Sequence, residues 1–374
     1  MAPDVAIARN KDVDRAVRDV LRCCDVEFSG TVFIKPNIAH NRPSPITTSA
    51  EVVRAVAENA FALGAEEVLV GDSPSYPTKY SMHRSIEQVY EGSGIAEAVE
   101  SAGAKMYFVD REKFVSVRID GLINWKPKIA KIALEADCLI NLPVMKTHHM
   151  TTVTLGIKNL HGLVQDSQKI LFHSDAIHAK LVDVLRAVRP ALTIVDATTA
   201  MEGNGPSQGS PVKLDTIVAS KDTVACDAVC CAIMGIDWRG IEHIKVAARC
   251  GLGVADLRKI NIIGTPLREC KRKFALPDLS IDYDGVDVYR GGVCTPCVAL
   301  LRTALHSLHT RDPEIMRDMN VYIGTNPPPA RERKLTFIVG DCACNSFDGK
   351  GIRIEGCPPF DVVTKIRETL AKGI

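Results

Sequence analysis

Cysteines in the last third of the chain have the spacing most typical of a bound cofactor. Cys294 and Cys297 form a C-x-x-C pair after two glycines, Cys342 and Cys344 follow an apolar run, and Cys357 lies in a Gly-Cys-Pro-Pro turn. Thiolates at turns and helix starts are stabilised by free backbone N–H groups, which also hydrogen-bond cluster sulfides. Cys294, Cys297, Cys342 and Cys357 are therefore the expected ligands of one [4Fe–4S] cluster.

Other interpretations of these cysteines stay open at this point. A structural zinc site usually takes two C-x-x-C pairs, and the sequence has one. A redox dithiol or plain buried thiols are further alternatives. Cys344 could replace Cys342 as a ligand, and three cysteines rather than four could bind the cluster. The remaining cysteines of the 13 in the chain stand in apolar or helical contexts, where buried small side chains are expected: Cys23, Cys24, Cys138, Cys226, Cys230, Cys231, Cys250 and Cys270.

Polar residues also follow the ends of several expected strands. Loops at the carboxyl ends of parallel strands meet at one edge of the sheet, so we expect these side chains to gather there. Lysines would hold carboxylate or phosphate oxygens, histidines would move protons, and Asp196 or Glu202 would orient a histidine. His173 is a further acid–base candidate. The candidate catalytic residues are Lys35, Lys146, His148, His149, Lys158 and Glu202, and the candidates for binding a cofactor or substrate are Asn37, Asn159 and His161.

The elements that must position these residues alternate between apolar runs and helical periodicity. This alternation over residues 1–265 predicts an α/β domain with a mostly parallel sheet covered by helices on both faces. A charged, turn-rich stretch then predicts a boundary, and residues 266–374 form a smaller α/β domain that carries the cysteines. Strands are expected at 32–35, 68–71, 106–109, 138–142, 192–195, 216–219, 260–263, 321–324, 335–339 and 352–354, and helices at 50–63, 95–102, 128–135, 177–188, 222–234, 241–248, 298–308 and 360–370.

Composition excludes several classes of protein. The 374 residues include 46 Lys plus Arg against 45 Asp plus Glu, a net charge of +1, which argues against a nucleic-acid binder. The sequence contains no apolar stretch of the length that a membrane span needs. The first residues carry an acid and an Arg where a signal peptide would be apolar, so a cytoplasmic protein with reduced cysteines is expected.

Several of these segments, taken in order, resemble the domain-of-unknown-function 362 family. The segments are Ile34-Lys-Pro-Asn37, Asp137 to Pro143, Lys146-Thr-His148, Gly156 to Leu160 with Gly162, Met201 to Pro206, Ala219 to Asp227, and Met234-Gly235. The resemblance implies an α/β domain that is often fused to an iron–sulfur module. The compact C-x-x-C-x-x-C runs of the common fused module are absent from this chain, which favours one cluster over two.

These observations favour an enzyme in which one cluster acts as a Lewis acid on a small anionic substrate held by Lys35, Lys146 and Lys158. The reaction would be of the lyase, hydrolase or isomerase type. One alternative is a redox protein that takes electrons from a ferredoxin-like donor, because no flavin or nicotinamide motif is present. A second alternative is a non-catalytic cluster carrier or sensor. The sequence is also compatible with a homo-oligomer.

Overall fold

The computed structural model describes residues 2–75, 78–79, 82–172, 176–311, 313–316, 318–328 and 335–371. The chain divides into two compact units, and each is described by itself. The first contains residues 1–170 and 178–277, and the second contains residues 171–177 and 278–374. The stretch 266–277, expected in the C-terminal domain, thus belongs to the first unit. None of the helices in the described part of the chain is long and apolar enough to cross a membrane.

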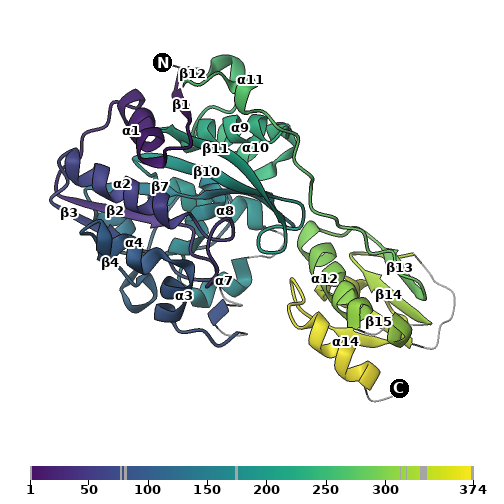
Figure 1. Ribbon diagram of the computed structural model, residues 1–374. Helices are drawn as coiled ribbons and strands as arrows, with labels where there is room; N and C mark the ends of the chain where they lie inside the picture. Colours follow the sequence, from purple (N-terminus) through teal and green to yellow (C-terminus); the bar gives the residue numbers. More distant parts are fainter. Residues whose placement is uncertain are drawn as a thin grey trace. The chain divides into compact units, whose positions relative to one another are not determined.

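A mostly parallel sheet forms the centre of the first unit, as expected from the sequence (Figure 1). Its strand order is β12-β1-β11-β10-β7-β2-β3-β4, and β11 alone on this path runs antiparallel to its neighbours. The elements before the boundary are β1 (Asp4–Arg9), α1 (Val13–Cys23), β2 (Thr31–Pro36), α2 (Ala50–Ala62), β3 (Glu67–Val70), α3 (Ile86–Ser93), α4 (Ile95–Ser101), β4 (Lys105–Met106), β5 (Phe114–Ser116), β6 (Lys128–Ala130), α5 (Ile132–Glu135), β7 (Cys138–Leu142), β8 (Val144–His148), β9 (Thr152–Thr154), α6 (Gly156–Asn159), α7 (Asp166–Phe172), α8 (Ile177–Val188), β10 (Leu192–Glu202), β11 (Ser210–Ser220), α9 (Thr223–Ile233), α10 (Glu242–Arg249), β12 (Asn261–Gly264) and α11 (Leu267–Cys270).

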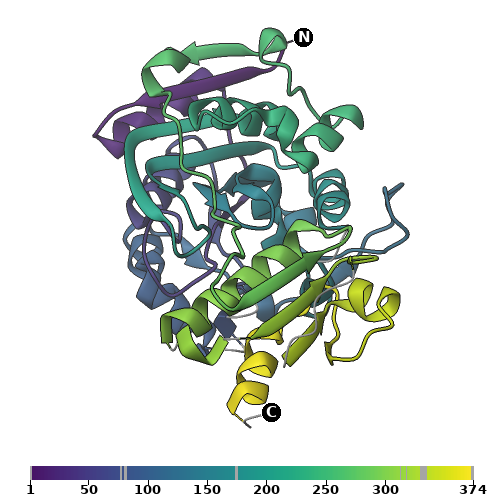
Figure 2. The same cartoon turned by 90° about the vertical axis from the view of Figure 1, so that its right-hand side faces the viewer.

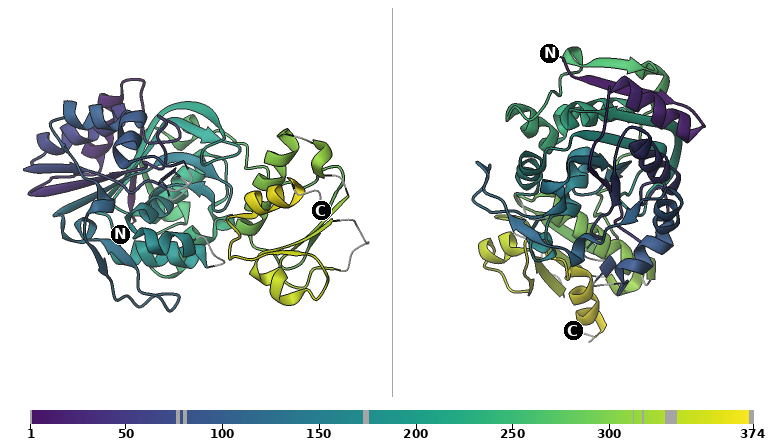
Figure 3. Two further views of the ribbon diagram at one scale, coloured as in Figure 1. Left: turned by 90° about the horizontal axis from the view of Figure 1, so that it is seen from below. Right: turned by 90° about the vertical axis from the view of Figure 1, so that its left-hand side faces the viewer.

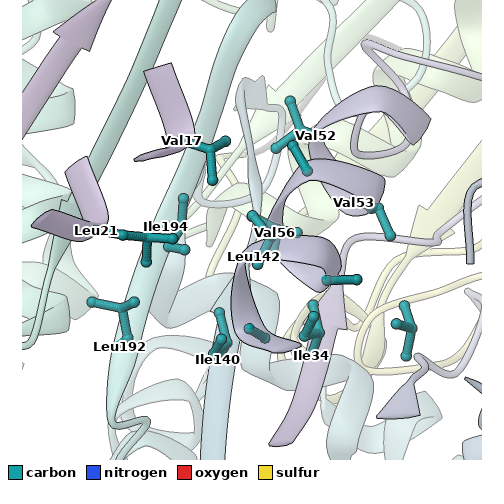
Figure 4. Close-up of a cluster of buried hydrophobic side chains, with 14 of the residues drawn as sticks. Val17, Leu21, Ile34, Val52, Val53, Val56, Ile140, Leu142, Leu192 and Ile194 are labelled. Carbon is teal, nitrogen blue, oxygen red and sulfur yellow. The ribbon is translucent and has the colours of Figure 1, made fainter. Parts of the chain in front are cut away.

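Helices α1 and α2 cover one face of this sheet with branched apolar side chains. Figure 4 shows Val17 of α1 and Val56 of α2 in one buried cluster with Ile34, Ile140 and Ile194 of strands β2, β7 and β10. Helices α6 and α9 contact strands of the same sheet, and α9 in turn contacts α10. Burial on both faces explains why the central strands read as continuous apolar runs.

Strands β10 and β11 form a long antiparallel hairpin that the sequence did not predict at this length (Figure 2). Each strand has 11 residues, so β10 continues through Glu202, where a loop was expected. A register shift between Ala197 and Thr199 interrupts the ladder, and β8 pairs with β10 on the other side. The hairpin therefore extends beyond the parallel strands and carries the Met201–Pro206 segment with it.

Two other expectations before the boundary were wrong. The helix expected at 128–135 is a strand, β6, followed by the short helix α5, because Ala130 pairs with Phe114 of β5. The strand expected at 106–109 ends at Met106, and a 3-10 turn over Val109–Arg111 follows it. Both differences arise from pairing with segments that the local sequence pattern does not reveal.

The second unit is built on a four-stranded sheet in which every neighbouring pair is parallel, in the order β13-β14-β15-β16. Figure 3 shows the helices of this unit against its sheet. Helices α12 and α14 pack with strand residues in one apolar core, whereas Ala343 of α13 packs with Tyr322 and Ile338 in a separate cluster. Strand β13 lies in the stretch where the sequence predicted a domain boundary, and α13 lies where no helix or strand was expected. The elements are β13 (Val286–Arg290), α12 (Thr295–Arg311), β14 (Met319–Ile323), β15 (Leu335–Val339), α13 (Asp341–Ser346), β16 (Ile352–Ile354) and α14 (Val362–Ala371).

Candidate functional site

A buried ion pair lies where β2 and β3 end. Lys35, the penultimate residue of β2, places its Nζ 2.8 Å from Oδ1 of Asp72, which follows β3, and both residues are almost fully buried. The same Nζ donates to the carbonyl of Pro36 at 2.8 Å, and Oδ2 of Asp72 accepts from the backbone of Ile38 at 2.9 Å. Burial lowers the pKa of Lys35, and Asp72 opposes that change. The partners compensate charges that would be costly to bury alone.

Gly162 is required by this ion pair. A Cβ atom at position 162 would lie 2.0 Å from Oδ1 of Asp72 and 2.8 Å from Nζ of Lys35. Neither atom can retreat, because each is fixed by the hydrogen bonds just described. The glycine noted in the sequence motif is therefore explained by close approach of its backbone to the ion pair.

Three asparagines connect the strand ends next to the ion pair. The side-chain oxygen of Asn159 accepts from Asn37 at 3.1 Å and from Lys35 at 3.3 Å. Its amide nitrogen donates to Asn141 Oδ1 at 2.9 Å, and Asn141 donates to the carbonyl of Gly156 at 2.9 Å. We call Lys35, Asp72, Asn37, Asn141, Asn159, Lys146 and Lys158 the lysine network.

Lys146 belongs to the network although it lies within strand β8 rather than in a loop. Its Nζ donates to Asn37 Oδ1 at 2.7 Å and to the carbonyl of Ile46 at 2.6 Å, and 1% of the residue is exposed. Burial, followed by the charges of Lys158 and Lys35, lowers the pKa of Lys146 to about 7, and Asp72 opposes the shift. Neutral and charged forms of Lys146 therefore coexist near neutral pH.

Lys158 lies on the short helix α6 and makes no hydrogen bond or ion pair with any residue in the described part of the chain. Only 8% of it is exposed. Burial, followed by the charges of Lys35 and Lys169, lowers the pKa of Lys158 to about 8, and Asp72 opposes the shift. The helix is anchored by Asp227, whose carboxylate accepts from the backbone nitrogens of Gly156 at 2.7 Å and Ile157 at 2.9 Å.

A second charged cluster surrounds the hydroxyl of Ser73, and its two lysines were not among the expected site residues. Lys79 and Lys169 both donate to Ser73 Oγ, which also hydrogen-bonds Asp110. Lys79 pairs with Asp110 at 2.9 Å, and Lys169 pairs with Asp166 at 3.2 Å. A cleft of about 530 Å³ opens beside Lys79, Asp110 and Asp166. Lys79 and Lys169 follow no expected strand, so no signal in the sequence marked them.

Of the histidines expected at the site, His148 and His149 lie together with their ring centres 5.0 Å apart. His148 is buried and its Nδ1 accepts from the backbone nitrogen of Met150 at 3.1 Å, which assigns the proton of the neutral ring to Nε2. Nδ1 of His149 lies 3.0 Å from the carbonyl of Gly205 and donates to it. His161 lies one turn after Lys158, in the 3-10 segment Leu160–Leu163. His173 falls outside the described residues.

Another histidine pair was not predicted. His178 at the start of α8 and His243 of α10 stack with ring centres 5.4 Å apart, and their Nδ1 atoms are separated by 3.2 Å. Burial is the main cause that lowers the pKa of both rings, and the nearby charge of Lys158 adds to it. Both imidazoles are therefore neutral at physiological pH and lie near Lys158.

In the described part of the chain, the partners of Asp196 and Glu202, the carboxylates expected to orient a histidine, are backbone nitrogens, Thr198 and Arg272. Asp196 is fully buried, and its carboxylate accepts from the backbone nitrogens of Ser49 at 2.8 Å and Thr198 at 3.0 Å. Glu202 accepts from the backbone of Ala275 at 3.0 Å and pairs with Arg272 at 3.3 Å. Both carboxylates therefore hold backbone segments in place through hydrogen bonds.

Four cysteines of the second unit follow strand ends on its parallel sheet. Cys294 and Cys297 come after β13 at the start of α12, Cys342 follows β15 within α13, and Cys357 follows β16. Because all four strands are parallel, these loops leave the same edge of the sheet. The topology thus brings together residues separated widely in sequence.

Contacts between the loops confirm this convergence. The backbone of Asp341 donates to the carbonyl of Gly356 at 3.2 Å, and Gly356 donates in return to Oδ1 of Asp341 at 2.6 Å. A Cβ atom on Gly340 would lie 3.6 Å from Sγ of Cys297. The pKa of the Cys297 thiol is raised first by its hydrogen bond with Cys294, then by burial and by the charges of Cys294, Cys357 and Cys342.

Cys344 has different surroundings from these four cysteines. Its Sγ donates to the carbonyl of Ile338 at 3.4 Å, and its side chain packs on the Tyr322 and Ala343 cluster. Residues 341–346 are helical, and residues two positions apart on a helix, such as Cys342 and Cys344, point to different sides. Across the described ranges, no three His, Cys, Asp or Glu side chains are grouped so as to hold a metal ion.

Comparison with known proteins places the lysine network in a defined family. The family described as Domain of unknown function (DUF362) matches residues 32–232, a range that contains the whole network. The chain belongs to the DUF362 family. A thylakoid-associated protein of Synechocystis sp. PCC 6803 is 33% identical over 237 residues, which cover 59% of this chain and 68% of that protein.

The DUF362 match ends at residue 232, before the part of the second unit, residues 278–374, that carries its cysteines. Among solved structures, the lactate racemase apoprotein from Thermoanaerobacterium thermosaccharolyticum gives a TM-score of 0.39 at 12% sequence identity. That match covers 60% of this chain and 56% of the racemase chain, little more than half of it. A likeness this distant carries no conclusion about the activity of this chain.

Within the lysine network, removing the charge of Lys35 and removing the charge of Lys158 should change the free energy of unfolding in opposite directions. Lys35→Met leaves Asp72 buried without its cation and should lower the free energy of unfolding by about 3 kcal/mol or more. Lys158→Met removes a buried cation that has no partner and should raise it by roughly 1–3 kcal/mol at pH 7. Urea unfolding of both variants at pH 7 measures the difference, and destabilisation by both would contradict it.

Stability should also rise with pH above neutrality. In the folded chain the pKa values of Lys146 and Lys158 are about 7 and about 8, against the usual 10.5. Between roughly pH 7 and 10 the unfolded chain therefore binds more protons, so raising the pH favours the folded state. The urea midpoint of wild type should increase from pH 7 to pH 9, and the increase should be smaller in Lys158→Met. Equal slopes would show that Lys158 does not titrate in this window.

Proposed function

We propose that the chain is an iron–sulfur protein whose C-terminal unit holds one [4Fe–4S] cluster and whose DUF362 domain binds a small anionic substrate. Cys294, Cys297, Cys342 and Cys357 would be the cluster ligands. The observation that carries the first part is the arrangement of these cysteines on loops at one edge of a parallel sheet. The lysine network carries the second part.

The cysteine loops fit a cluster in donor type and in backbone shape. All the proposed ligands are thiols, which is the usual ligand set of such clusters. Gly340 and Gly356 have φ values of 85° and 128°, and they let the backbone turn tightly where a bulky group would need room. A cluster distributes its thiolates over several irons, so its ligands need not be as close as those of a single ion. The cluster would supply a Lewis acid at an exchangeable iron, or electrons if all its irons are held by protein.

The lysine network fits an anion because it contains more cationic than anionic groups. Lys35 is paired with Asp72, whereas Lys146 has only neutral partners and Lys158 has none in the described residues. An anion near Lys146 and Lys158 would favour their charged forms, which burial now disfavours. His148, with its proton on Nε2, would serve as a proton donor. A reaction of the lyase, hydrolase or isomerase type would proceed without net electron flow, whereas a reductase would need a ferredoxin-like donor.

Metal and sulfide analysis tests the cluster. Protein purified without oxygen should be brown and contain about four iron and four acid-labile sulfide per chain. Cys294→Ser, Cys297→Ser and Cys357→Ser should each lose or weaken the cluster because each removes a thiolate. Cys23→Ser and Cys270→Ser, which alter cysteines of the first unit, serve as controls and should retain it. Stoichiometric zinc without sulfide would overturn the proposal.

Cys342 and Cys344 form a matched pair for a finer test. Cys342→Ser should lower the iron and sulfide content, because the charge of Cys342 acts on Cys297 at the proposed site. Cys344→Ser should leave the content unchanged, because this thiol is bonded to Ile338 and packed away from the others. Iron and sulfide assays on both variants give the answer. The reverse result would assign the ligand to Cys344.

A further inference from the structure

Lys158 differs from the other lysines of the network in the partners of its amine. Lys35 bonds Asp72 and the carbonyl of Pro36, and Lys146 bonds Asn37 and the carbonyl of Ile46. Lys158 is nine-tenths buried, yet it bonds no group in the described residues. A buried polar group normally has a partner. Its amine is therefore free to meet a ligand.

Neighbouring cations make the amine of Lys158 reactive as well as free. Lys35 and Lys169 are close enough for their charges to disfavour the protonated form, and burial acts in the same direction. Because its pKa is about 8, a minor fraction of this largely buried amine is unprotonated near neutral pH, and that fraction is a nucleophile toward carbonyl carbon. An exposed lysine such as Lys105, which pairs with Glu67 at the surface, lacks both conditions.

The stacked pair of His178, which is partly buried, and His243, which is fully buried, can supply the proton transfers that such an amine needs. His178 and His243 share a contact between their Nδ1 atoms, and Nε2 of His243 has no hydrogen-bond partner in the described structure. Both rings are neutral because of burial, and both respond to the charge of Lys158. Neutral imidazoles near an amine can accept one proton and return another.

We propose that Lys158 forms an imine with the carbonyl carbon of a small 2-oxo carboxylate. This inference rests on the proposed function, because the carboxylate is the anion and the lysine network is its site. Lys146 lies near enough to Lys158 for the two charges to act on each other. The carboxylate would compensate the charge of Lys146 while the adjacent carbonyl reaches Lys158.

The reaction balances without an oxidant or reductant. The lone pair of Nζ forms a C–N bond to the carbonyl carbon, and the carbonyl oxygen takes up a proton to give a carbinolamine. A histidine accepts the proton lost by nitrogen, and a proton is delivered to the hydroxyl as the C–O bond breaks. The products are the imine and one water molecule.

Reductive trapping tests this proposal on the full chain with its metal content intact. The protein is incubated at pH 7 with pyruvate and sodium cyanoborohydride, which reduces an imine to a stable secondary amine. Peptide mass spectrometry should locate the adduct at Lys158 in excess over the surface residue Lys105. Lys158→Arg should reduce labelling to the level of Lys105 because its guanidinium forms no imine, whereas Lys105→Arg should leave labelling of Lys158 unchanged. A wild-type adduct at Lys158 no greater than at Lys105 would overturn the imine.

A matched anion separates the imine from the proposed function on which it rests. Propionate has the carboxylate but no carbonyl, so it should leave no adduct yet slow labelling by pyruvate. Calorimetric binding of propionate without any pyruvate adduct would overturn the imine and leave the anion site standing. Absence of both propionate binding and the pyruvate adduct would overturn the anion site too.

His243→Gln should slow labelling by pyruvate roughly a hundredfold without lowering its final extent, because the amine of Lys158 remains while proton transfer by His243 is lost. An unchanged labelling rate would show that the histidine pair takes no part in the reaction.

Discussion

Burial of positive charge is the constraint on which the first unit depends. Isolated ammonium groups are costly to remove from water, yet Lys35, Lys146 and Lys158 are all almost fully buried. The fold lowers this cost in three ways: a carboxylate pairs with Lys35, neutral oxygens accept from Lys146, and Lys146 and Lys158 both have lowered pKa values that allow partial loss of the proton. Asparagines, whose amides both donate and accept, complete the hydrogen bonds around these groups. The polar centre is thus a single connected structure rather than a set of independent contacts.

In both units, side chains gather at the carboxyl ends of parallel strands, although the chemical groups that gather there differ. In the first, side chains from the ends of β2, β3 and β7 meet around Lys35, and in the second, loops after β13, β15 and β16 bring cysteines together. Parallel strands place all their carboxyl ends on one edge, so residues far apart in sequence become neighbours there. One edge carries amines and amides, and the other carries thiols. A chain with this organisation can hold hard and soft ligands on separate scaffolds.

Much of this arrangement could be predicted from sequence because its signals are local. Lys35 and Asn37 end an apolar run, and Cys294 and Cys297 share a motif. Parallel pairing of the strands then brings the residues that follow each strand to one edge of the sheet. Other residues could not be found, because their positions depend on contacts that no short pattern encodes. Lys169 reaches Ser73 from a helix 96 positions away, and His178 meets His243 across two helices. The residues of β6 by themselves predict a helix, because the pairing of this strand with β5 leaves no signal in its own sequence.

The absence of a side chain at Gly162 limits which substitutions the family can accept at the positions of the ion pair. Its missing side chain leaves space that Lys35 and Asp72 occupy, so the three positions are sterically one unit although they lie in different segments. A substitution at 162 becomes acceptable only after the ion pair is gone, and the ion pair can arise only where a glycine already stands. Among relatives these positions should therefore change together or not at all. Relatives that have glycine at position 162 should then be the ones that also have the buried ion pair.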